Sequence, residues 1–210
     1  MPSHGYCALP RCRCIIRGMS LTISAEERLF LLALARDSIA SALAGRKLQE
    51  PALAEGFPNL KTHCGVFVSL HDSPPGGQKE GQLRGCIGRL TSVEPLYKTV
   101  QVMAREAAFS DPRFAPLQKE ELQRCSIEIS ALSPMTLCFD PKAIKVGLHG
   151  LYLKRMGRSG VFLPQVPVQQ RWNLEKYLEH LCMKARLPQG SFCAPDAELY
   201  TFTAEVFSEE

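Results

Sequence analysis

Apolar residues in the N-terminal third of the chain repeat with the spacing of an α-helix. From Leu29 to Leu43 they recur every three or four positions, which predicts a helix over residues 25–44. The preceding Ser24-Ala-Glu-Glu27 has the form of a capping box, in which Ser24 and Glu27 bond each other's main-chain amides. Gly45 follows where a left-handed residue commonly ends a helix.

Two later segments have the same helical spacing. Leu96, Val100, Met103 and Ala107 predict a helix over about residues 94–108. Apolar positions from Leu174 to Ala185 predict another, with Asn173 as its N-cap.

Alternating or β-branched stretches between these helices predict strands. They cover residues 64–71, 124–132, 146–153, 161–163 and 200–206, with a turn at 156–160. Helices and strands are mixed without regular βαβ alternation, and several neighbouring strands are hairpin-like. The predicted fold class is therefore α+β, with a largely antiparallel sheet flanked by helices.

Composition and charge narrow the class of protein. The chain has 210 residues, of which 45% are hydrophobic and 22% charged, as expected for a globular chain of one large domain. No apolar run approaches the roughly 20 residues of a membrane helix. Three arginines in residues 1–18 supply most of the +4 charge, and the body is near neutral. We therefore expect no nucleic-acid surface and no membrane segment.

The nine cysteines are odd in number and scattered through helix and strand patterns, which favours reduced thiols in the cytosol over a disulfide framework. Residues 1–18 contain Cys7, Cys12 and Cys14 without a metal-binding spacing or a secretory signal. We expect this segment to be a disordered tail or to lie upstream of a start at Met19.

The stretch LRGCIG at residues 83–88 is the first candidate site. Gly85 and Gly88 permit a sharp bend and a close approach, and exposed amides there could bind an anion. Cys86 lies between Arg84 and Arg89, and nearby cations would lower the pKa of a thiol. The alternative is that Cys86 is a small apolar residue in a structural position, as most free cysteines are.

Asp111-Pro-Arg-Phe114 is the second candidate site. Asp111 and Arg113 flank a rigid proline, so they could orient each other or bind a carboxylate or phosphate. The structural alternative is an exposed ion pair in the loop that ends the helix.

His149, between glycines in the third candidate segment, is a possible base for Cys86. It could equally be a strand residue bonded to the backbone. The polar Glu128 in mid-strand is expected to face solvent. The residues predict no metal site, and they leave open whether the protein uses a cofactor.

Seven ordered segments together resemble the AMMECR-type domain, called AmmeMemoRadiSam system protein A in prokaryotes. They are GVFVSL (65–70), LRGCIG (83–88), AREAAFSDPRFAP (104–116), IEISALSP (127–134), HGLYL (149–153), GVFLPQV (160–166) and the Trp-containing pattern at 172–187. The resemblance spans about residues 21–207. One departure is Phe192, near which family members often carry a tryptophan.

The resemblance implies a single domain over residues 19–207, with a larger lobe built from both chain ends. It implies a smaller lobe around 64–120 that holds LRGCIG beside a cleft. The family name implies two partners, a Memo-like protein and a radical SAM enzyme. No family reaction transfers to this chain.

Two functions remain open at this point. One is a cytosolic component that binds a small molecule, a peptide or a partner protein through Arg84, Gly85, Gly88, Arg89 and Arg113. The other is a small enzyme with Cys86 as nucleophile, helped by His149 or Asp111. The residues favour the binding protein slightly, because no clear partner for the thiol stands out.

Overall fold

The computed structural model describes residues 22–51, 57–72 and 81–209. The N-terminal segment 1–18 and most of the loop after residue 72 lie outside the described residues. The chain folds into two compact units. One comprises residues 20–134 with 205–210, and the other contains residues 135–204.

The first unit is built on a four-stranded sheet with the order β2-β1-β3-β8. The strands are β1 (Val66–Asp72), β2 (Gln82–Arg89), β3 (Cys125–Leu132) and β8 (Ala204–Ser208). β1 pairs antiparallel with both β2 and β3, so β2 is an edge strand. The end of the chain completes this sheet, where Glu209 N–H donates to the carbonyl of Ile127 at 3.0 Å.

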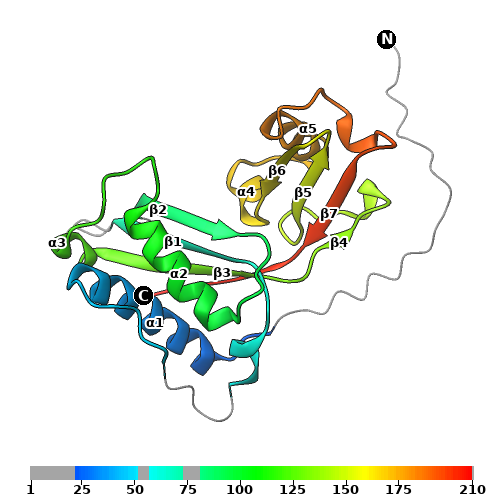
Figure 1. Ribbon diagram of the computed structural model, residues 1–210. Helices are drawn as coiled ribbons and strands as arrows, with labels where there is room; N and C mark the ends of the chain where they lie inside the picture. Colours follow the sequence, from blue (N-terminus) through cyan, green and yellow to red (C-terminus); the bar gives the residue numbers. More distant parts are fainter. Residues whose placement is uncertain (1–21, 52–56, 73–80, 210) are drawn as a thin grey trace. The chain divides into compact units, whose positions relative to one another are not determined.

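Two helices, α1 (Ala25–Leu43) and α2 (Leu96–Phe109), pack against each other and onto the strands of this sheet (Figure 1). The apolar alternation of β1 and β3 directs Val68, Leu70 and Ile129 into the core beneath these helices. Short elements complete the unit: η1 (Pro58–Lys61) and α3 (Lys119–Leu122).

The predicted start of α1 is confirmed. Ser24 Oγ accepts a hydrogen bond from Glu27 N–H at 3.2 Å, and Glu27 Oε2 accepts one from Ser24 N–H at 2.9 Å. The carboxylate of Glu27 also accepts bonds from the main-chain and side-chain amides of Asn59, which explains how an acidic residue is buried here. Gly45 is left-handed, with φ +68°.

The second unit is a four-stranded antiparallel sheet with the order β4-β7-β5-β6. Its strands are β4 (Thr136–Leu137), β5 (Gly150–Arg155), β6 (Arg158–Phe162) and β7 (Glu198–Phe202). Its α-helices are α4 (Gln165–Gln169) and α5 (Leu174–Lys184). Two short 3-10 helices, η2 (Pro141–Ala143) and η3 (Ser191–Cys193), complete the unit. Leu151, Leu153 and Leu199 pack with Leu178 and Leu181 of α5 to form its core. Asn173 caps α5 through a 2.9 Å bond from Lys176 N–H.

The α+β class with antiparallel sheets is confirmed, and three details differ from the prediction. The segment predicted as one last strand is two strands, β7 and β8, which belong to different sheets. The strand predicted from residue 146 begins at Gly150, because residues 146–148 form a turn. The β5–β6 hairpin turns tightly at Met156 and Gly157, both with positive φ, as a two-residue hairpin requires.

The division into units also differs from the predicted lobes. LRGCIG lies in the larger unit, not in a smaller lobe around residues 64–120. The reason is the pairing of the strands, since β2 bonds to β1, and β1 bonds to β3 in the same sheet. The smaller unit is instead residues 135–204.

Candidate functional site

LRGCIG lies within a strand and contains an irregularity in its pairing. All six residues lie in β2, but the register with β1 passes from Leu70–Gly85 to His71–Leu83, which leaves Arg84 without a partner on β1. Neither Gly85 nor Gly88 has a positive φ, so the predicted sharp bend at these glycines is wrong. A nest of amides needs turned backbone, so the predicted anion cradle at these glycines loses its structural basis.

Close packing explains the two glycines. A Cβ atom on Gly85 would lie 2.2 Å from the carbonyl oxygen of Ala107, so α2 approaches β2 at this point as only glycine allows. A Cβ atom on Gly88 would lie 2.3 Å from the ring of Phe67, which covers the other face of the strand. Both glycines fix the position of β2 between a helix and an aromatic ring.

The main-chain groups of Cys86 are held by the loop that follows α2. Cys86 N–H donates to Oδ2 of Asp111 at 2.9 Å, and Arg113 Nη2 donates to the carbonyl of Cys86 at 3.4 Å. These two groups therefore point away from β1, and the pair Ser69–Cys86 is a non-hydrogen-bonded pair of the antiparallel ladder. One carboxylate and one guanidinium cap the edge strand here.

The sulfur of Cys86 lies on the face of the sheet opposite the helices. Ser69 Oγ on β1 donates a hydrogen bond to Sγ at 3.2 Å, and the thiol is partly exposed. Glu128 on β3 lies on the other side of Ser69 in the same row. Ser69 was missed by the sequence reasoning, because its position beside Cys86 depends on the strand register.

Asp111 is buried, with only 4% of its surface exposed, and its carboxylate is fully used. Oδ1 accepts bonds from Arg113 Nε at 2.9 Å and from Arg113 N–H at 3.1 Å, and Oδ2 accepts one from Nη2 at 2.7 Å. The Arg113 guanidinium, with help from the amides of Cys86 and Arg113, holds the pKa of this carboxyl well below its usual range. Asp111 is therefore a fixed acceptor at neutral pH, which does not suit general acid–base work.

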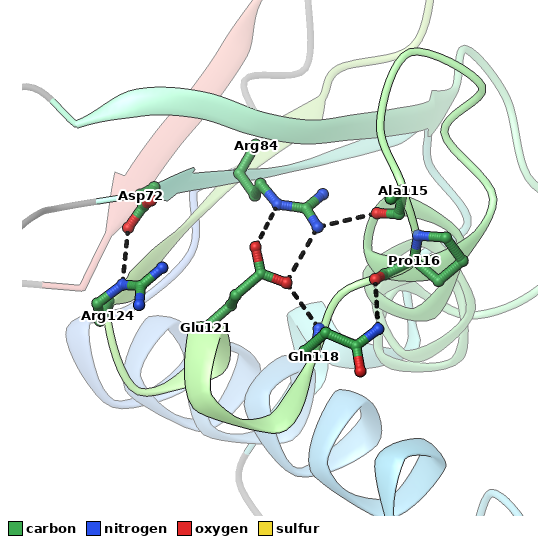
Figure 2. A network of polar contacts seen from close by, with 7 residues as sticks. All are labelled: Asp72, Arg84, Ala115, Pro116, Gln118, Glu121 and Arg124. Carbon is green, nitrogen blue, oxygen red and sulfur yellow. Dashed lines mark hydrogen bonds and ion pairs between the residues drawn. The ribbon is translucent and has the colours of Figure 1, made fainter.

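Arg84 ties β2 to the same loop from another side (Figure 2). Its Nε and Nη2 atoms donate to Glu121 at 2.9 and 3.1 Å, and Nη2 also donates to the carbonyl of Ala115 at 2.8 Å. The bond from Arg84 lowers the pKa of the Glu121 carboxyl, which in turn accepts from Gln118 N–H at 2.8 Å. Arg84, with 14% of its side chain exposed, is thus a structural anchor.

The 110–118 loop is held firmly by these contacts. Leu117 N–H bonds to the carbonyl of Ala108 at 2.9 Å, which closes the loop at its base, and Leu117 is buried. Exposed residues lie between the anchors, and the side chain of Arg113 is 55% exposed. The guanidinium carbons of Arg113 and Arg84 lie 5.4 and 5.8 Å from the ring centre of Phe114, within cation–π range.

The remaining predicted site residues, Arg89 and His149, belong to other segments of the chain. Arg89 is the exposed last residue of β2. His149 belongs to the unit of residues 135–204, where its Nδ1 accepts from Lys145 N–H at 3.2 Å. Burial, and to a lesser degree Lys145, lowers the pKa of His149, so its ring is neutral at pH 7 with the proton on Nε2. The role of His149 as a base for Cys86 remains a prediction.

Neither a metal cluster nor a membrane helix is found in the part of the chain that the structure describes. No three His, Cys, Asp or Glu side chains gather there as metal ligands would. No described helix has the length and apolar content to cross a bilayer.

Comparison with known proteins gives one consistent family. The AMMECR1 family model matches residues 32–207. Protein MK0488 of Methanopyrus kandleri is 40% identical over 201 residues, which cover 92% of each chain. Protein TK0174 of Thermococcus kodakarensis is 41% identical over 86% of this chain and 89% of its own.

A solved structure agrees with these matches. The crystal structure of the uncharacterized protein PH0010 from Pyrococcus horikoshii superposes with a TM-score of 0.79 at 38% identity, covering 90% of this chain and 94% of that one. The arrangement of elements described above is therefore that of a solved relative.

Proposed function

Because this chain belongs to the AMMECR1 family, we propose that it is a cytosolic binding protein that presents the 110–118 loop to a partner protein or small ligand. Its partners are a Memo-like protein and a radical SAM enzyme, the two proteins that the prokaryotic family name implies. The observation that carries the proposal is the way Arg84 and Asp111 fix this loop on β2.

A fixed loop suits binding for an energetic reason. Ordering a flexible loop on association costs free energy, and a loop that is already held avoids that cost. Four anchoring contacts hold it: Asp111 to Cys86, Arg84 to Ala115, Arg84 to Glu121 and Leu117 to Ala108. Binding residues are commonly found on loops that a rigid scaffold positions.

The side chains at the surface of the loop also suit binding. Arg113 is exposed and Phe114 is half-buried, and arginine and aromatic residues are enriched at the centres of protein interfaces. Pro112, Ala115 and Pro116 around them are exposed and uncharged. Such a surface offers a cation and an aromatic ring within an apolar rim.

The alternative is a small enzyme with Cys86 as nucleophile, and one observation favours it. The Ser69 hydroxyl donates a hydrogen bond to Sγ, and the thiol is partly exposed. A nucleophilic thiol also needs a base, and Asp111 is engaged with Arg113 and with the Cys86 amide. For this reason we place binding ahead of catalysis.

The test uses purified proteins. The chain is mixed with the Memo-like protein and the radical SAM enzyme of its own organism, and complexes are separated by size-exclusion chromatography. Mass spectrometry of the isolated chain identifies any small molecule that it retains. We expect a complex with at least one of the two proteins, or a retained ligand whose release requires unfolding. Separate elution of all three proteins without a retained ligand would contradict the proposal.

A further inference from the structure

The short helix α3 follows directly on the 110–118 loop and carries one of the anchors of that loop. Glu121 of α3 accepts two hydrogen bonds from Arg84, and its Oε2 also accepts one from the N–H of Gln118, where the loop ends (Figure 2). Arg84 in turn donates to the carbonyl of Ala115 in the middle of the loop. The position of α3 therefore fixes both the end of the loop and the guanidinium that holds its middle.

A helix of only four residues is not stable by itself, so α3 depends on contacts with its surroundings. The carbonyl of Leu122, its last residue, accepts a hydrogen bond from Nη1 of Arg36 on α1 at 2.9 Å. Nη2 of the same guanidinium donates to the carbonyl of Cys125, the first residue of β3, at 2.7 Å. Arg36 thus bonds the main chain on both sides of the turn that joins α3 to β3.

Arg36 is itself held by Glu209, which lies 173 positions later in the sequence. Nε of Arg36 donates to Oε1 of Glu209 at 2.7 Å, and Nη2 donates to Oε2, so the ion pair is bidentate. Only 33% of the Arg36 side chain and 21% of the Glu209 side chain are exposed. A partly buried pair is screened less than one on the open surface, so the carboxylate is the main electrostatic partner of this guanidinium.

Glu209 is fixed on β3 by its main chain and by its side chain. Its N–H donates to the carbonyl of Ile127, and its Oε2 accepts from the N–H of Ile127 at 2.9 Å. Ile127 has no exposed surface, so its buried amide needs an acceptor. The carboxylate supplies that acceptor one residue beyond the end of β8, and this places it where it meets Arg36.

We propose that Glu209 is a positioning residue for the 110–118 loop and acts on it through Arg36 and α3. Without the carboxylate, the Arg36 guanidinium has no charged partner and turns towards water, which releases the carbonyl of Leu122. The helix then loosens, and the anchor between its Glu121 and the strand β2 loosens with it. The consequence for binding rests on the function proposed for the loop, whereas the coupling itself does not.

Glu205 offers a matched comparison, because it lies on β8 and makes a similar ion pair. Its Oε2 accepts from Nη2 of Arg28 at 2.7 Å, and its side chain is 22% exposed. The guanidinium of Arg28 donates to the carbonyl of Ile23, just before α1. Within the described residues, neither member of this pair bonds to α3 or to the loop. Loss of the pair should therefore lower stability without reaching the loop.

Hydrogen exchange of the free protein, followed by NMR, tests the coupling. Glu209→Gln removes the charge and keeps the size of the side chain, and Glu205→Gln is the control. The amide of Leu117 reports on the closed base of the loop, and the amide of Val68 reports on the core of β1. We expect Glu209→Gln to speed exchange at Leu117 at least about fivefold more than it speeds exchange at Val68, because the loop opens locally. Glu205→Gln should produce no such difference.

Three results would overturn the proposal: unchanged exchange at Leu117 in Glu209→Gln, an equal acceleration at Val68, or the same local acceleration in Glu205→Gln. Circular dichroism checks that each variant is folded. If Glu209→Gln is unfolded, Arg36→Lys takes its place, because a lysine keeps the charge but lacks the fork that bonds three acceptors at once. Unchanged exchange at Leu117 in that variant would refute the coupling. No partner is present in these measurements, so their outcome is separate from that of the proposed binding function.

Discussion

The main-chain amide of Cys86 donates a 2.9 Å hydrogen bond to the buried carboxylate of Asp111, 25 residues further along the chain. This bond joins the LRGCIG strand to the 110–118 loop. Asp111 therefore holds the main chain of Cys86 in place. The two segments therefore form one surface of the first unit.

Removing the guanidinium of Arg113 should destabilise the fold. Arg113→Ala leaves the Asp111 carboxylate buried without its charged partner, and we expect a loss of about 3 kcal/mol in the free energy of unfolding. Arg124→Ala is the matched control, because Arg124 makes a longer, exposed pair with Asp72 and should cost less than about 1 kcal/mol. Urea unfolding of both variants measures the difference, and equal losses would contradict the predicted importance of the Asp111 pair.

The stability supplied by Asp111 should depend on pH. Its carboxyl has a lower pKa in the folded state than in the unfolded chain, so the stabilisation is present at neutral pH. It is lost as the pH falls below about 4 towards the folded pKa. The difference in unfolding free energy between wild type and Asp111→Asn should therefore stay constant from about pH 7 to about pH 5 and then narrow. A difference that widens in acid would be the opposite of this expectation.

A methyl group on Gly85 should disrupt the packing of α2 on β2. Gly85→Ala places Cβ against the Ala107 carbonyl oxygen, and we expect a loss of about 2 kcal/mol or more. Ala107→Gly should not rescue it, because the clash is with the backbone. Gly88→Ala should be rescued only in part by Phe67→Ala, since its Cβ atom would meet the ring of Phe67 at 2.3 Å and also the main-chain oxygen of Val66 at 2.6 Å. Thermal unfolding of the single and double variants tests this contrast, and rescue of Gly85→Ala by Ala107→Gly would show that the backbone is not the obstacle.

The thiol of Cys86 should react as an ordinary accessible cysteine. Iodoacetamide labelling at neutral pH, quantified for each cysteine, should give Cys86 a rate within about threefold of the half-exposed Cys193. Cys64 should react far more slowly, because burial raises the pKa of its thiol to about 11. A Cys86 rate many times that of Cys193 would favour the enzymatic alternative.

Local signals in the sequence were enough to predict the helices and most strands. The capping box of α1 and the apolar stripe of α5 each lie within one element, so no distant contact is needed to read them. The division between β7 and β8 could not be read, because alternation continues through Thr203 while the chain passes from one sheet to the other.

The candidate site was predictable only in part, for a related reason. Residue type and local context singled out Cys86, Asp111 and Arg113. The pairing of Arg84 with Glu121 joins residues 37 positions apart, and the contact of Ser69 with Cys86 depends on the register of β1 and β2. No pattern in one sequence encodes such contacts directly.

The binding surface on the 110–118 loop is most directly tested by the affinity of the chain for the Memo-like protein and the radical SAM enzyme. Calorimetry compares wild type with Phe114→Ala and with the matched control Phe139→Ala, each checked for folding. Arg113→Ala is not a suitable probe of the surface, because it also removes the ion-pair partner of Asp111. We predict that Phe114→Ala weakens the complex by at least about tenfold and that Phe139→Ala leaves it unchanged. A complex of equal affinity in all three proteins, or no complex with either partner and no ligand retained, would contradict the account.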